Sequence, residues 1–132
     1  MMGEWVKVYD LMEDTETIQL VQRATLNTKE FGLEPDVALY GSDEWWRAVD
    51  DGRIATHSVS GTISRVYMSG HGDWPEFEVD SGGEKTRWTR VGDQSLYEPG
   101  RPVKVEYVLQ KRRTRVLGEL EQKEVLRIFI ER

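Results

Sequence analysis

The sequence contains no cysteine and only two histidines among its 132 residues. Without cysteine there is no disulfide, thiolate nucleophile or thiolate metal ligand, and a cytoplasmic location is the expected one. Long apolar runs are missing as well, so no transmembrane helix is expected. The segment Met1–Val6 lacks the basic flank and the apolar core of a secretory signal. The remaining composition, 38% hydrophobic and 32% charged, predicts a small soluble folded domain.

Sequence motifs of well-known catalytic and cofactor sites are also absent. The chain has no G-x-S-x-G, H-E-x-x-H or EF-hand pattern, and no G-x-G-x-x-G. The stretch Gly82–Thr86 has the letters of a phosphate-binding loop, but it leads into a strand and offers no helix N-terminus to a phosphate. His71 and Asp73 could begin a metal site, but His57 lies at the far end of a long strand. We therefore expect no enzyme, no metal and no cofactor.

Charge is unevenly distributed along the chain. Residues 1–55 carry 12 acidic and five basic side chains, whereas residues 56–132 carry 12 acidic and 13 basic ones. The segment 101–115 concentrates six basic residues against one acidic residue, Glu106. Nucleic-acid binding depends on clustered Lys and Arg, so the net charge of −6 disfavours it without excluding the basic segment.

The first 55 residues show alternating strand and helix signals. Residues 5–9 predict a strand, and Asp14 and Thr15 begin a helix that ends near Gly32. The apolar face of this helix is expected to consist of Leu20, Val21, Ala24, Thr28 and Phe31. Residues 36–40 predict a second strand, and Ser42 caps a second helix that ends before Gly52. This order predicts a strand–helix–strand–helix unit with a right-handed parallel crossover.

From residue 56 onward the hydrophobic period changes to two. Five strands are expected at residues 57–68, 74–80, 85–91, 101–111 and 123–131, with a β-bulge near Ser64 and Arg65. This strand pattern resembles the oligonucleotide/oligosaccharide-binding (OB) barrel, and an SH3-like barrel is the alternative. The predicted fold is α+β: residues 56–132 form a small five-stranded antiparallel barrel, on which the acidic unit 1–55 packs. The two parts are expected to form one cooperative domain.

The most specific local prediction is a hairpin with a two-residue turn at Gly82-Gly83. That turn fixes the register, so that residues whose numbers add up to 165 lie opposite each other. The inner face then pairs Phe77 with Trp88 and Val79 with Thr86, and the outer face pairs Glu78 with Arg87 and Asp80 with Lys85. Aromatic pairs and opposite charges are the cross-strand partners that stabilise such a ladder.

Candidate binding residues follow from the OB resemblance, which implies a ligand across the second and third strands. Aromatic stacking with nearby Lys and Arg is how such surfaces hold single strands. The candidates are Tyr67, His71, Trp74, Lys111, Arg112, Arg113 and Arg115. Trp45 and Trp46 are expected in the core, and whichever of them is exposed would mark a partner surface.

These observations favour a non-enzymatic binding or interaction module whose partner is another protein, with no membrane involved. The alternative is a single-stranded nucleic-acid binder that uses the barrel face. A small hydrolase comes third, because Glu76, Glu78 and Asp80 share one face of a strand, as a two-carboxylate mechanism would need. Cross-strand ion pairs account for these carboxylates more simply.

Overall fold

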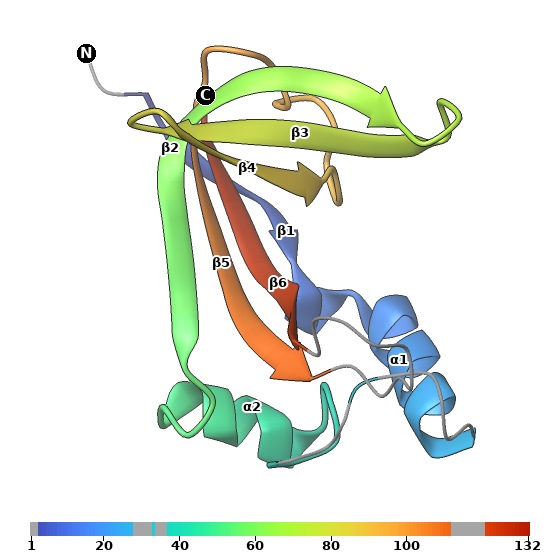
Figure 1. Cartoon of the computed structure of the whole chain (residues 1–132). Coiled ribbons are helices and arrows are strands. Elements are labelled where there is room, and N and C mark those ends of the chain that lie inside the picture. The colour runs from blue at the N-terminus through green and yellow to red at the C-terminus, as the bar shows by residue number, and fades with distance from the viewer. Residues whose placement is uncertain (1–2, 28–32, 34–36, 112–120) are drawn as a thin grey trace. The chain divides into compact units, whose positions relative to one another are not determined.

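The described part of the chain folds into six strands, two α-helices and one 3₁₀ helix (Figure 1). The computed structural model describes residues 3–27, 33, 37–111 and 121–132. The strands form one sheet in the order β1-β6-β5-β2-β3-β4. The elements are β1 (Trp5–Asp10), η1 (Leu11–Glu13), α1 (Thr15–Asn27), α2 (Asp43–Asp50), β2 (Thr56–Ser69), β3 (Trp74–Ser81), β4 (Glu84–Thr89), β5 (Pro102–Lys111) and β6 (Glu121–Glu131).

The sheet is antiparallel and open, so the prediction of a closed five-stranded OB-like or SH3-like barrel is wrong. Its two edges are β1 and β4, and β1 pairs antiparallel with β6, with Trp5 opposite Glu131. The first strand therefore joins the sheet of the later strands, and the parallel crossover is also wrong. Pairing between strands more than 110 residues apart leaves no local signal, because strand patterns specify a face and not a neighbour.

The second predicted strand, at residues 36–40, is absent from the part of it that the structure describes. Residues 37–40 form bends and the start of a turn, and Ala38 and Tyr40 are buried. A short apolar run is ambiguous, since it fits a buried loop as well as a buried strand. The strand–helix–strand–helix unit therefore reduces to one strand followed by two helices.

Two compact units divide the chain. Unit 1 comprises residues 1–10, 58–106 and 127–132, and unit 2 comprises residues 11–57 and 107–126. Unit 1 has a core of strand residues that are almost completely buried, among them Ile63, Phe77, Val79, Val103, Val105, Ile128 and Ile130. Cooperative unfolding of residues 1–55 with residues 56–132 stays a prediction.

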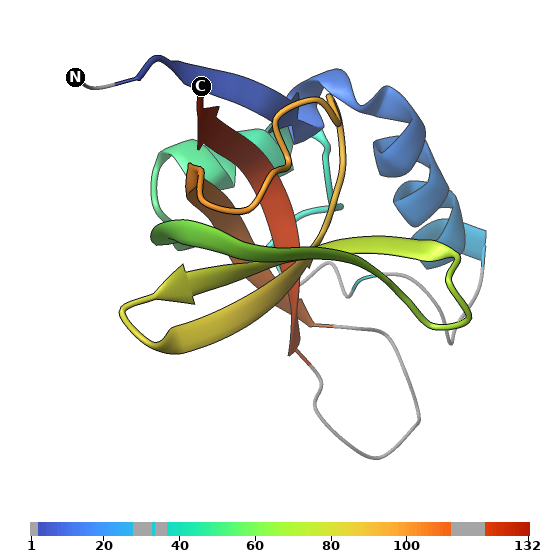
Figure 2. The same ribbon diagram turned by 90° about the horizontal axis from the view of Figure 1, so that it is seen from above.

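The hairpin register is confirmed in unit 1, where β2, β3 and β4 follow one another as a meander (Figure 2). Phe77 lies opposite Trp88 and Val79 opposite Thr86, and both turn glycines have positive φ. The bulge is confirmed too, because the β2–β3 register shifts between Ile63 and Arg65. Local turn chemistry and side-chain alternation thus place every residue of this hairpin.

The charges on the other side of the hairpin differ from the prediction. Glu78 lies opposite Arg87 as expected, but it is buried, with 7% of its surface exposed. Its carboxylate accepts a 2.9 Å hydrogen bond from Ser64 Oγ and lies 3.9 Å from Lys85 Nζ. The cation partner of Glu78 is therefore diagonal to it, and Ser64, the bulge residue, supplies the hydrogen bond.

Unit 2 contains α1 and α2, and of the described residues predicted for the apolar face of its first helix, Val21 and Ala24 are half-buried and Leu20 is exposed. Thr25 is the buried side chain of α1, while Leu20 is 57% exposed. Thr25 Oγ1 donates to Val21 O at 2.9 Å and accepts from Leu33 N at 3.0 Å. This buried hydroxyl fastens the helix to the segment that follows it. The predicted contacts of Thr28 and Phe31 and the stop at Gly32 lie outside the described residues.

The second helix is confirmed with its cap. Ser42 Oγ accepts a 3.2 Å hydrogen bond from Trp45 N, which satisfies one of the first N–H groups of α2. Trp45 is fully buried between Tyr40 and Trp46, with ring centroids 5.0 and 4.9 Å away. Its indole Nε1 donates to Gln110 Oε1 at 3.2 Å. The buried indole is therefore paired, as a polar atom in a core must be.

Candidate protein-interaction surfaces

The far end of the β2–β3 hairpin, in unit 1, brings together two of the predicted binding residues. Tyr67 Oη donates to Glu76 Oε1 at 3.0 Å, and the guanidinium of Arg65 lies 4.3 Å from the centroid of the Tyr67 ring. Burial, and next the hydrogen bond to Glu76, raise the pKa of Tyr67. Trp74 is 54% exposed, and its Nε1 donates to Thr89 Oγ1 at 3.2 Å. Both rings are held in place by hydrogen bonds.

We call the face of the hairpin that carries Arg65, Tyr67 and Trp74 the hairpin-tip patch. On the opposite face Met68 is 48% exposed, and Arg90 Nη2 lies 3.3 Å from its sulfur and donates to Tyr67 O at 3.0 Å. Trp, Tyr, Met and Arg are the residues that protein interfaces favour. His71 is exposed in the neighbouring turn. The patch has the composition of an interface, and its use as one stays a prediction.

The structure describes one of the remaining predicted binding residues of the basic segment. Lys111 is exposed at the end of β5, in unit 2, and Arg112, Arg113 and Arg115 lie outside the described residues. Trp45 and Trp46 are 0% and 9% exposed, so they occupy the core position expected for them and do not form an exposed pair. In the part of the chain that the structure describes, no three His, Asp or Glu residues gather as a metal-binding group, and no helix could span a membrane.

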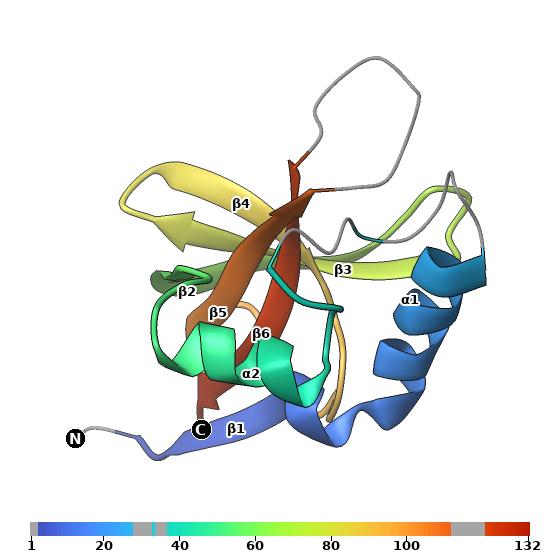
Figure 3. The same ribbon diagram turned by 90° about the horizontal axis from the view of Figure 1, so that it is seen from below.

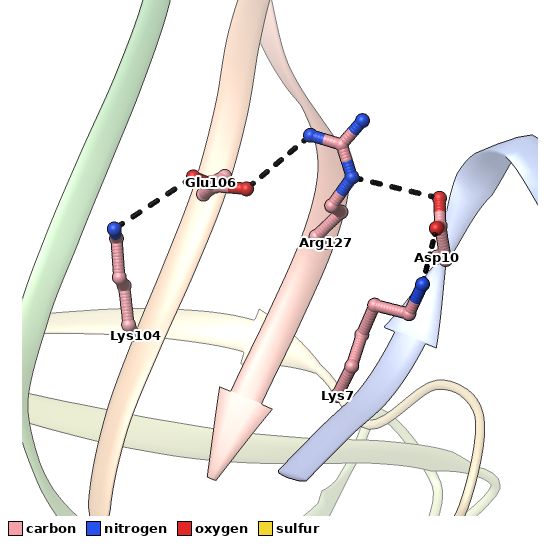
Figure 4. Close-up of polar contacts among 5 residues, drawn as sticks. All are labelled: Lys7, Asp10, Lys104, Glu106 and Arg127. Atoms are coloured by element: carbon pink, nitrogen blue, oxygen red, sulfur yellow. Dashed lines mark hydrogen bonds and ion pairs between the residues drawn. The ribbon is translucent and has the colours of Figure 1, made fainter. Parts of the chain in front are cut away.

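A chain of ion pairs that was not predicted from the sequence crosses three strands of unit 1 (Figure 4). Asp10 on β1 pairs with Lys7 at 2.8 Å and with Arg127 on β6 at 3.8 Å. Arg127 also pairs with Glu106 on β5 at 3.4 Å, and Glu106 with Lys104 at 3.7 Å. The β1–β6 pairing creates this network, and residues so far apart in sequence carry no spacing signal. Its charges largely compensate one another.

An apolar groove of about 560 Å³ lies on unit 1 beside this network. Its walls include Trp5, Phe129 and Pro102, and Lys104 and Glu106 of the ion-pair network also line it. Trp5 is 45% exposed. This groove is a further surface that could accept an apolar side chain.

A larger groove of about 610 Å³ lies in unit 2 and is lined by residues of η1, α1 and α2. Figure 3 shows the two α-helices that contribute to it. Its apolar lining comprises Met12, Ile18 and Trp46. Gly41 also lines it, with φ at +75°, and a Cβ there would come within 2.5 Å of Ile18 Cγ2. Only glycine allows this approach, because it combines a positive φ with the absence of a side chain. We call this site the α1–α2 groove.

The elements that line the α1–α2 groove carry an excess of acidic residues. Together η1, α1 and α2 have five acidic and two basic side chains, a net charge of −3. Asp43 and Arg47 lie in the lining itself. This groove was not predicted, because Trp46 was expected in the core and neither Met12 nor Ile18 was assigned to a surface. The signal that could have found it is the excess of acidic residues in η1, α1 and α2.

Comparison with known protein families shows a match over nearly the whole chain. A family model described as "Immunity protein RhsI2" matches residues 6–131. No curated protein matches the chain. The matched range includes the described helices and strands, apart from Trp5 at the start of β1.

Proposed function

This chain belongs to the RhsI2 immunity protein family, and we propose that it protects the cell that makes it by binding and neutralising a cognate toxin protein. Immunity proteins bind a cognate toxin protein, so the class of partner is a protein, as the sequence predicted. The observation that supports the proposal is the family match over residues 6–131. The described surface adds exposed apolar and aromatic side chains that could anchor a partner.

The mechanism that we propose is stoichiometric, since one bound chain covers the working surface of one toxin molecule. A stable protein complex buries roughly 800 Å² on each partner. That area is about a tenth of the 8312 Å² accessible surface of this chain. Such an interface needs a few well-packed anchor residues, which supply most of the binding energy. We place the encounter in the cytoplasm, where a chain without cysteine is unaffected by the reducing conditions.

The test expresses the cognate toxin in cells with and without this chain and measures growth. Growth should be restored only when the chain is present, and the two purified proteins should form a complex of fixed stoichiometry by size-exclusion chromatography. Titration should abolish toxin activity at one equivalent of the chain. Unrelieved toxicity in the presence of the folded chain would refute the proposal, and complete inhibition at a small fraction of one equivalent would indicate an enzyme.

A further inference from the structure

We propose that the α1–α2 groove is the docking site for a cationic segment of the toxin that inserts apolar side chains between the two helices. This inference rests on the proposed function and goes beyond it, because neither the family nor its name specifies a surface or the chemistry of the segment. Four features of unit 2 support it: an accessible apolar lining, a net negative charge, a rigid construction and an exposed apolar residue of α1 beside the lining.

The lining provides room and apolar contact for side chains of a partner. Met12 is 50% exposed, and the groove of about 610 Å³ extends from it to Ile18 and Trp46. Beyond the groove, α1 also presents Leu26, which is 69% exposed and lies one helical turn after the lining residue Gln22. Large exposed apolar residues beside a groove are typical of protein-binding sites. This part of α1 is therefore available for a partner.

The charge specifies the chemistry of the occupant. Asp43 lies in the lining, Glu13 follows Met12 in sequence, and Glu44 and Asp50 flank the lining residues of α2. The cation in the lining, Arg47, has Asp43 and Asp50 at helical spacings of four and three residues, which compensate its charge locally. A partner segment rich in Lys or Arg would meet a negative potential here, and an acidic one would be repelled.

Hydrogen bonds within unit 2 hold the helix α1 that lines the groove, so the groove is preformed. Gln22 Nε2 donates to Tyr40 O at 2.9 Å, which ties α1 to the loop before α2. Thr25 ties the same helix to Leu33. Asp14 Oδ1 accepts from Thr17 N at 3.2 Å and holds the first turn of α1. A rigid receptor loses little conformational entropy on binding, so more of the contact energy appears as affinity.

The two candidate surfaces of unit 1 have no large excess of one charge sign, so they do not favour a cationic or an acidic partner. The hairpin-tip patch combines Arg65 with Glu76, and the groove beside Trp5 adjoins the compensated ion-pair network. Both contain exposed aromatic rings, but neither carries an excess of one sign comparable to the −3 of η1, α1 and α2. They serve as controls in the experiment.

The experiment measures binding of the purified cognate toxin to the full chain and to charge-reversed variants at several salt concentrations. In the test variant, Glu13→Lys is combined with Asp50→Lys, because neither change removes an acid from the first turn of an α-helix. The matched control combines Glu84→Lys with Glu98→Lys, two exposed acids of unit 1. We expect the test variant to bind on the order of tenfold or more weakly at low salt, mainly through slower association. The control should stay within about twofold of the native chain.

A second variant tests the apolar contact without changing any charge. Met12→Gln keeps the length of an exposed side chain, so folding should be unaffected, and toxin dissociation should become faster. Thermal unfolding of each variant verifies that it is folded. If the native chain fails to bind the toxin, the proposed function is wrong. If the native chain binds and all groove variants bind equally well, the groove is not the docking site, and loss of binding in Trp74→Ala would place the interface at the hairpin tip.

Discussion

The two units of the molecule differ in what holds their elements in place. Unit 1 buries apolar strand faces, and Phe77, Val79 and Val103 in its core have no exposed surface. Unit 2 also has buried apolar residues, and side-chain hydrogen bonds tie its two helices to other segments, with Trp45 bonded to Gln110 and Gln22 to Tyr40. Apolar burial stabilises a core in proportion to its area, whereas hydrogen bonds fix positions with a small net gain.

This difference has a functional consequence. Because directional bonds hold α1 in place, the helix does not need to bury Leu20 and Leu26, which remain exposed. Unit 1 cannot expose its core residues in this way, since its stability depends on the packing of those apolar side chains. Unit 2 is therefore the part in which a binding surface can vary without loss of the fold. The predictions below test this contrast, from the largest expected effect to the smallest.

Trp88→Ala tests the packing of unit 1. Trp88 is 5% exposed, lies opposite Phe77, and donates from Nε1 to Thr86 Oγ1 at 2.8 Å. Truncation leaves a large cavity, so the free energy of unfolding should fall by about 3–5 kcal/mol. Chemical denaturation measures this change. Trp74→Ala, in the same hairpin but exposed, is the control and should cost less than about 1 kcal/mol; equal losses in both variants would contradict the contrast.

Thr25→Val tests the hydrogen-bonded construction of unit 2. The change keeps the shape of the side chain but removes the hydroxyl that Leu33 N donates to, and Leu33 is 3% exposed. A buried N–H without a partner costs about 1–3 kcal/mol, and the free energy of unfolding should fall by that amount. Thr25→Ser retains the hydroxyl and should recover most of the loss. A valine variant as stable as the native chain would show that this bond does not hold α1.

Glu124→Gln tests a charge within unit 2. Burial raises the pKa of the Glu124 carboxyl above its ordinary value of 4.5, while a hydrogen bond from Gln122 opposes part of the shift. The folded chain thus retains this proton when the unfolded chain has lost it, so the contribution to stability is present below pH 4.5 and lost as pH rises through the folded pKa. The glutamine variant should be the more stable protein at neutral pH. Unfolding measured from pH 4 to pH 8 should show this difference shrinking as the pH falls.

The same contrast explains how much could be predicted from the sequence. The β3–β4 hairpin was predicted residue by residue, because Gly82 and Gly83 fix the turn and alternation does the rest. The cap of α2 at Ser42 is equally local. The contacts of α1 were not predicted. Thr25 bonds to Leu33 and Gln22 bonds to Tyr40, and these partners come close only when the chain folds. A hydrophobic pattern indicates which residues could be buried, and tertiary contacts decide which of them are.

Predictability of the candidate surfaces follows the same rule. Tyr67 and Trp74 were selected as an aromatic pair, and they do lie in one hairpin. The α1–α2 groove depends on Gly41 meeting Ile18, 23 residues earlier in the sequence, and on the position of Met12 beside them. The ion-pair network depends on β1 lying beside β6. Neither could be predicted from spacing.

Arg87→Ala should have the smallest effect of the series. Arg87 is exposed and lies opposite Glu78, the arrangement in which an ion pair was expected. Glu78 instead accepts from Ser64 Oγ at 2.9 Å and has Lys85 Nζ at 3.9 Å, so its carboxylate keeps these partners when Arg87 is removed. Exposed ion pairs contribute less than about 1 kcal/mol, and chemical denaturation should show a loss below that value. Ser64→Ala is the informative comparison, because it removes the hydrogen bond of a buried carboxylate and should cost more. A larger loss for Arg87→Ala than for Ser64→Ala would show that the guanidinium, and not the bulge hydroxyl, stabilises Glu78.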